Sequence, residues 1–220
     1  MMKAKRTKHK IRALTLFEVL VVVAIVVVGA AILVMIMTDQ QKKAQRFACL
    51  NNIKEIGLAY RVWEGDNNNK FPAFVSVTNG GIMEWTNCGA QIVVSNFLVM
   101  SNEMGSPKIL ACPQDTNVIA VNDFGRLTIS NISYLMNRDA SDDEPQLLLS
   151  GDDNLLVNRS PAPPGNLVLP TNAAVIWSTN RYRAAGNLGF ADGSAREIPG
   201  NRLTFEFRSA GAFTNQIILP

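Results

Sequence analysis

The sequence has almost no histidine: the single one among its 220 residues is His9, near the N-terminus. Imidazole is the side chain that most often serves as a general base near neutral pH, and it is a common metal ligand. The sequence also has no glycine-rich phosphate loop and no G-x-S-x-G nucleophile elbow. We therefore expect a protein that is not an enzyme.

Charge is absent from residues 19–37, a run of nineteen predominantly apolar residues. At about 1.5 Å per residue, a helix of this length spans roughly 28 Å, close to the hydrocarbon thickness of a bilayer. A cleaved secretory signal would have an apolar region of about 7–15 residues, ending at a small-residue cleavage site. The longer run here predicts one transmembrane helix, over residues 14–38.

Acidic residues are absent from residues 1–13, where all six charged side chains are basic: Lys3, Lys5, Arg6, Lys8, Lys10 and Arg12. The positive-inside rule therefore keeps the N-terminus in the cytoplasm and places the chain after the apolar run on the opposite side of the membrane. Without these six residues the net charge of +3 becomes −3. The basic balance thus gives no support to nucleic-acid binding, and nucleic acid is not an expected partner.

One carboxylate, Glu18, precedes the apolar run directly. A carboxylate near a membrane costs a few kcal/mol unless it has a partner, so such a residue is a functional hypothesis by default. One interpretation is electrostatic: Glu18 is solvated at the interface and is favoured by the positive end of the helix dipole. The other follows from the residues around it.

The block Ala13-Leu14-Thr15-Leu16-Phe17-Glu18, after a basic leader and before an apolar run, resembles the processing and methylation site of type IV prepilins and type II secretion pseudopilins. The resemblance implies that residues 1–13 are a leader peptide, cut off after Ala13 on the cytoplasmic side. Leu14 would then be the N-methylated first residue. Glu18 would be the fifth residue of the mature chain, as in the family, although Ala13 and Leu14 stand where the family has Gly and Phe.

The resemblance also implies an assembly role for Glu18, because in these filaments the glutamate meets the free amine of a neighbouring subunit's first residue. The implied partners are the prepilin peptidase/methyltransferase, other pseudopilins, and an inner-membrane assembly platform. The implied location is a single pass through the inner membrane with a periplasmic head. No cofactor is expected, with the exception of a calcium ion of the kind that type II major pseudopilins hold in their heads.

A second helical segment follows the membrane run. Residues 39–64 contain no proline and only one glycine, and apolar residues recur there at spacings of three and four: Phe47, Leu50, Ile53, Ile56, Tyr60 and Trp63. The segment 39–65 is therefore predicted to continue the helix with one face packed on a domain. A sustained heptad pattern, which an independent coiled coil would need, is absent.

Residues 66–220 hold all ten prolines and most of the glycines, and are expected to form a loop-rich β head. Asp192-Gly193 predicts a hairpin turn, and residues 96–104 a short helix. The predicted fold class is α+β, pilin-like, with the long helix packed on an antiparallel sheet. The strand candidates are residues 92–94, 108–111, 127–130, 146–150, 173–177, 187–190, 194–198 and 203–207.

Later segments extend the resemblance. Residues 49–59, 66–68, 71–72 and 110–113, and residues 186–193 with their Asp-Gly motif at Asp192-Gly193, resemble landmarks of the large pseudopilin-like families of planctomycete and verrucomicrobial bacteria. Some members of these families have a histidine ten residues before that aspartate. Tyr182 occupies this position here. From the residues alone, Arg181, Tyr182 and Arg183 are expected in an exposed loop, with a basic aromatic patch that binds a partner as the alternative.

The chain has three cysteines, Cys49, Cys88 and Cys112, and one disulfide can form between them if the head lies in the oxidising compartment outside the cytoplasm. The favoured pair is Cys88 with Cys112, which closes a modest loop; Cys49 with Cys112 is the alternative and would tie the helix to the head. A zinc site is not expected, because no two of these cysteines have ligand spacing.

Two groups of carboxylates in the head are candidates for a calcium site, because hard cations take several oxygen ligands from loops. The first comprises Asp139, Asp142 and Asp143, with Glu144 beside them, and the second comprises Asp152 and Asp153. Neither has the spacing of a helix-loop-helix calcium site. Solvated turns are the simpler interpretation of both.

Taken together, these observations predict a noncatalytic pseudopilin-like subunit of a type II secretion-like filament. A subunit of a type IV pilus or competence filament shares the same sequence features. An unprocessed, membrane-anchored binding module is the alternative of a different class, and it predicts an intact N-terminus and no dependence on Glu18.

Overall fold

The computed structural model describes residues 15–86, 88–170, 172–182, 184–210 and 216–220. The predicted processing site at Ala13 and Leu14 lies outside these residues. The chain divides into two compact units, Met1–Lys43 and Ala44–Pro220.

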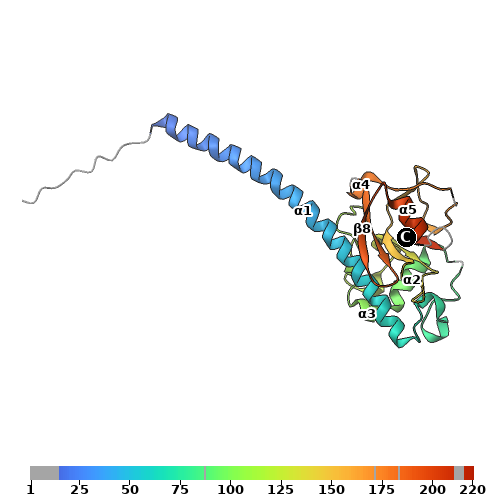
Figure 1. Cartoon of the computed structure of the whole chain (residues 1–220). Coiled ribbons are helices and arrows are strands. Elements are labelled where there is room, and N and C mark those ends of the chain that lie inside the picture. The colour runs from blue at the N-terminus through green and yellow to red at the C-terminus, as the bar shows by residue number, and fades with distance from the viewer. Residues whose placement is uncertain (1–14, 87, 171, 183, 211–215) are drawn as a thin grey trace, which may run out of the picture. The chain divides into compact units, whose positions relative to one another are not determined.

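Helix α1 (Leu16–Asp66) is 51 residues long and is drawn in blue to green in Figure 1. It confirms the prediction of a single helix that continues past the apolar run. In the first unit, residues 16–33 have a mean hydropathy of 3.0 and none of them is buried. By length and composition, this part of α1 is able to cross a membrane.

In the second unit, α1 buries a stripe of residues at spacings of four and three: Cys49, Ile53, Ile56, Tyr60 and Trp63. The predicted stripe began at Phe47 instead, but the Phe47 side chain is 66% exposed. Phe47 lies two residues from Cys49, which at 3.6 residues per turn puts it on the opposite side of the helix. Leu50 is half-buried on the flank of the stripe.

Within the described chain, the stripe packs on an antiparallel sheet of six strands in the order β5-β9-β1-β2-β7-β8. The head is therefore α+β, as predicted. The strands of this sheet are β1 (Tyr134–Asn137), β2 (Leu148–Asp152), β5 (Gly165–Leu167), β7 (Ala185–Phe190), β8 (Ala195–Pro199) and β9 (Ile217–Leu219).

Both faces of this sheet are buried, because alternate residues of its strands enter different cores. Tyr134 and Met136 of β1 belong to the core beneath α1. Leu135, between them, belongs to a second core with helix α5 (Leu203–Ser209). A smaller sheet in the order β4-β3-β6 contributes to this second core, and its strands are β3 (Leu155–Val157), β4 (Ser160–Pro161) and β6 (Val175–Trp177).

Several strand predictions are wrong. Residues 92–94 lie in helix α2 (Gln91–Val99), since a short buried apolar run does not distinguish helix from strand. Residues 203–207 form α5, in which Leu203 and Phe207, four residues apart, are buried while Phe205 is 64% exposed. The predicted helix at 96–104 corresponds to the end of α2 and to α3 (Ser101–Met104).

Short 3₁₀ helices account for much of the rest of the head. Residues 108–111, predicted as a strand, lie mostly in η3 (Pro107–Leu110), and residues 127–130 overlap η5 (Ile129–Asn131). The remaining short helices are η1 (Pro72–Phe74), η2 (Val77–Asn79), η4 (Phe124–Arg126) and α4 (Thr179–Tyr182).

The predicted Asp192-Gly193 turn joins β7 to β8, which pair antiparallel. Gly193 has a φ of +81°, a conformation that glycine adopts without strain. The turn also lies against α1: a Cβ atom on Gly57 would come within 3.3 Å of the Gly193 Cα. The Asp-Gly motif is therefore part of the contact between helix and sheet.

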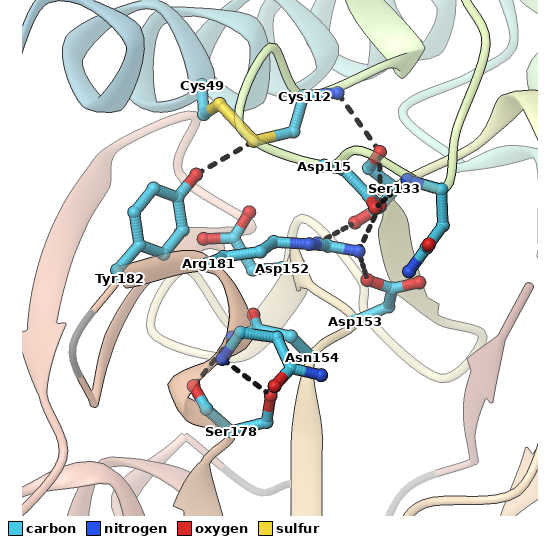
Figure 2. Close-up of polar contacts among 12 residues, drawn as sticks. Cys49, Cys112, Asp115, Ser133, Asp152, Asp153, Asn154, Ser178, Arg181 and Tyr182 are labelled. Carbon is cyan, nitrogen blue, oxygen red and sulfur yellow. Dashed lines mark hydrogen bonds and ion pairs between the residues drawn. A yellow bond between two sulfur atoms is a disulfide. The ribbon is translucent and has the colours of Figure 1, made fainter. Parts of the chain in front are cut away.

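The disulfide joins Cys49 to Cys112, so the favoured pairing of Cys88 with Cys112 is wrong (Figure 2). Cys49 and Cys112 are both buried, with Cα atoms 5.1 Å apart, whereas Cys88 is exposed and has a free thiol. Burial of Cys112 beneath α1 decides the pairing. The bond ties α1 to the segment between η3 and β1.

We expect the double variant Cys49→Ser/Cys112→Ser to lower the free energy of unfolding by about 2–5 kcal/mol, because the bond closes a long loop. The matched control, Cys88→Ser, removes an exposed thiol and should leave stability unchanged. Urea unfolding of the full chain in micelles, followed by tryptophan fluorescence, measures both. A disulfide-linked peptide containing Cys88 in a non-reducing digest would contradict this pairing.

Candidate functional site

The N-terminus of α1 carries a capping box formed by Thr15 and Glu18. The Thr15 backbone N–H and Oγ1 both donate to Glu18 Oε2, at 2.9 and 3.0 Å, and the Glu18 N–H donates to Thr15 Oγ1 at 3.3 Å. This arrangement satisfies backbone donors that a helix N-terminus otherwise leaves open. The T-x-x-E spacing of Thr15 and Glu18 in the sequence is the signal for this box.

The first group of candidate calcium ligands is held by protein partners. Asp142 forms an ion pair with Arg61, and Asp139 Oδ2 accepts the Gln216 N–H at 2.7 Å. Asp143 is exposed. Among the residues that the structure describes, no group of three or more Asp, Glu, His or Cys side chains is arranged to hold a metal ion.

The second group, Asp152 and Asp153, belongs to a buried network around Arg181 (Figure 2). The Arg181 guanidinium forms ion pairs with Asp115 and with Asp153, the latter at 2.5 Å. It also donates to the Ser133 backbone oxygen at 3.1 Å. The predicted exposed loop is therefore wrong here: Arg181 lies in α4 with a side chain only 9% exposed, because two carboxylates compensate its charge.

The Arg181 network is continuous with the disulfide. Ser133 Oγ donates to Asp115 Oδ2 and accepts the Cys112 N–H, both at 3.0 Å. On the other side of the bond, the Tyr182 hydroxyl lies 2.9 Å from Cys112 Sγ and must be the donor, since a disulfide sulfur carries no hydrogen. Tyr182 is buried, whereas an exposed position was expected.

Asp152 is fully buried beside this network. Its Oδ2 accepts the backbone N–H and the side-chain amide of Asn187, at 2.7 and 3.0 Å. Its Oδ1 is buried without a hydrogen-bond partner among the described residues. Burial raises the pKa of Asp152 to about 7, against the opposing effect of the Arg181 charge.

Asp153 behaves in the same way: burial raises its pKa to about 6, although Arg181 favours its charged form. Three carboxylates thus share one guanidinium, and the excess negative charge is relieved when a proton binds. The network ties together the loops that carry Asp115, Ser133 and Asp153, because each of them bonds to Arg181.

Asp152→Asn should weaken the pH dependence of stability. Folded Asp152 keeps, up to about pH 7, a proton that the unfolded chain releases near its ordinary pKa of 3.8. Wild-type stability should therefore fall as pH rises through this window and level off above it. We expect a smaller difference in urea midpoint between mildly acidic and mildly alkaline buffer for the variant. Asp143→Asn, at an exposed carboxylate, is the matched control and should keep the wild-type pH dependence. An equal change of urea midpoint with pH in the wild type and both variants would refute the raised pKa of Asp152.

Comparison with known proteins gives no relative: no protein-family model matches the chain, and neither a curated protein nor a solved structure is significantly similar to it.

Proposed function

We propose that this chain is a pseudopilin-like structural subunit, cut after Ala13 by a prepilin peptidase and assembled through its N-terminal helix into a type II secretion-like filament. The observation that carries the proposal is the first part of α1. Its apolar side chains over residues 16–33 are exposed, and its single charge is the carboxylate of Glu18.

Apolar surface on this scale is unstable in water and has to contact lipid or another protein surface. Burial of apolar surface is worth about 25 cal/mol per Å², and Leu16, Phe17 and Ile25 alone are each 67–84% exposed. Lipid covers such a helix before assembly. In a filament, the same helices of neighbouring subunits take the place of lipid, so one apolar surface serves both states.

The geometry of Glu18 suits a second partner. Both Thr15 donors bind Oε2, and among the described residues Oε1 has no hydrogen-bond donor. A neighbouring subunit's N-terminal amine could therefore bind Oε1 while the capping box stays intact. In an apolar surrounding such a pair is strong when complete and costly when one member is missing.

The disulfide supports a head outside the cytoplasm, because protein disulfides form and persist in oxidising compartments. Cys49 follows the membrane-length segment in the sequence, so the whole head would lie on the same side as the bond. This agrees with the orientation that the basic N-terminal segment favours.

N-terminal mass spectrometry of the protein from membranes of its own host tests the processing. We expect a first residue Leu14, with or without a methyl group, and an uncut chain in a peptidase-deficient strain. An intact N-terminus in both strains would refute the proposal and would favour a membrane-anchored binding module. A subunit of a type IV pilus or competence filament would undergo the same processing. The filament into which the protein assembles in its host distinguishes such a subunit from a pseudopilin.

Glu18→Gln should impair assembly without impairing folding. Glutamine can still form the capping box, but it loses the charge that would pair with an amine. The loss of one charged hydrogen bond corresponds to a reduction of about 10- to 100-fold in recruitment between subunits. Cross-linking of neighbouring subunits in membranes, with a reagent that does not react with cysteine, measures this recruitment.

Glu55→Gln is the matched control for this variant, because it neutralises an exposed carboxylate on the same helix and should cross-link as the wild type does. Equal membrane abundance of the variants shows that insertion is intact. Wild-type cross-linking of Glu18→Gln would contradict the assembly role.

A further inference from the structure

Helix α5, drawn in red in Figure 1, carries an exposed aromatic side chain between exposed arginines. Phe205 is 64% exposed, whereas Leu203 and Phe207 on the other side of the helix are buried. Arg202, just before α5, and Arg208 lie three residues on either side of Phe205, and both are exposed. Side chains three residues apart share one side of a helix. The outer side of α5 is therefore basic and aromatic.

A third arginine extends this surface from strand β8. The Arg196 side chain is 54% exposed, and its guanidinium lies over the Phe190 ring, 4.3 Å from the ring centroid. Its Nη2 donates to Glu206 Oε2 at 2.9 Å, and Arg202 pairs with Oε1 of the same carboxylate at 3.2 Å. One carboxylate thus holds two guanidiniums in place. Because each guanidinium has five N–H donors, both keep donors for a further partner.

This surface presents positive charge to solvent. Glu206, the acidic residue of α5, is only 5% exposed, so the accessible charge comes from the three arginines. The acidic residue of β8, Glu197, pairs instead with Arg46 of α1. It lies on the other face of the sheet, because neighbouring residues of a strand point to opposite faces. Charge complementarity therefore favours an acidic partner.

The shape and composition of this surface favour a protein as that partner. The outer side of a helix is convex, whereas sites for small molecules are concave. Aromatic residues and arginine are the side chains that are enriched in protein–protein interfaces. A guanidinium also matches the geometry of a carboxylate, since it can donate two parallel hydrogen bonds to it.

We propose that the outer side of α5, together with Arg196 of β8, binds an acidic segment of another protein. Carboxylates of that segment pair with Arg196 and Arg202, and one of its apolar side chains packs on Phe205. Helix α5 belongs to the core on the face of the sheet opposite to α1. The interaction therefore goes beyond the proposed assembly and does not depend on processing or on Glu18.

Photo-cross-linking of the full chain in micelles of a zwitterionic detergent tests the proposal. The probe is a short glutamate peptide with one central benzoylphenylalanine, and the same peptide with lysines in place of the glutamates is the charge control. We expect the glutamate peptide to cross-link to residues 202–209, located by mass spectrometry of a digest, and the lysine peptide not to. Absence of a cross-link at α5, including reaction only with the basic residues before Ala13, would overturn the proposal, as would equal cross-linking of both peptides.

Competition distinguishes an acidic protein from an acidic polysaccharide. Polyglutamate should displace the probe from α5 at a lower concentration of carboxylates than polygalacturonate does, because only the protein partner is expected to fit this convex surface. The reverse order would favour an acidic glycan and would overturn the assignment to a protein.

Two variants at exposed positions should fold normally and weaken binding. Arg202→Gln should raise the probe concentration for half-maximal cross-linking at α5 about two- to fivefold, the effect of losing one exposed ion pair. Phe205→Ala should raise it about tenfold, as at an interface hot spot. Arg126→Gln, at an exposed arginine in η4, is the matched control and should behave as the wild type does. Equal half-maximal concentrations for all three variants would refute the role of this surface.

Discussion

The head depends on the packing of residues 49–63 of α1 against the six-stranded sheet. The buried stripe of the helix supplies one of the two cores of the head, and the second core forms on the opposite face of the same sheet. Close approach is possible because Gly57 meets the Asp192-Gly193 turn and Ile53 packs directly over Gly189. A Cβ atom at Gly189 would lie only 2.6 Å from Ile53 Cγ2, so a side chain there would force helix and sheet apart. A Cβ atom at Gly57 would lie 3.3 Å from the Gly193 Cα and would press on the turn.

The disulfide extends this contact into the polar part of the head. Cys49 binds Cys112, whose N–H is bonded to Ser133; Ser133 in turn bonds Asp115, which pairs with Arg181. A chain of direct contacts therefore runs from the core beneath α1 to Arg181. In Figure 2 these groups lie in one continuous path. Asp115 is buried and bonded on both sides, so this chain of contacts ties the loop that carries Asp115 to the disulfide.

The sequence predicts the parts of this fold that follow from periodicity. The extent of α1, the hairpin at Asp192-Gly193 and the α+β class depend on local patterns and were predictable. The disulfide was not, because loop length says nothing about which cysteine is buried beneath α1. The helix α5 was missed since Leu203 and Phe207 fit either period over five residues, and its Glu206 is buried only because Arg196 and Arg202 pair with it. The Arg181 network joins residues 115, 133, 153 and 181. Local sequence patterns do not predict contacts between residues that lie so far apart in the sequence.

Under the proposed assembly, Glu18 would serve both the isolated helix and the filament. A carboxylate at the start of a membrane-length helix is costly, and the capping box reduces that cost by giving one of its oxygens two donors from Thr15. The second oxygen keeps a demand for a donor, which water or lipid head groups can meet only at the membrane surface. Moving the helix into an apolar bundle removes those donors, so the carboxylate then requires a cation from the neighbouring chain. In the proposed filament, Glu18 would therefore penalise any bundle whose register places no amine beside it, and would determine register more than stability.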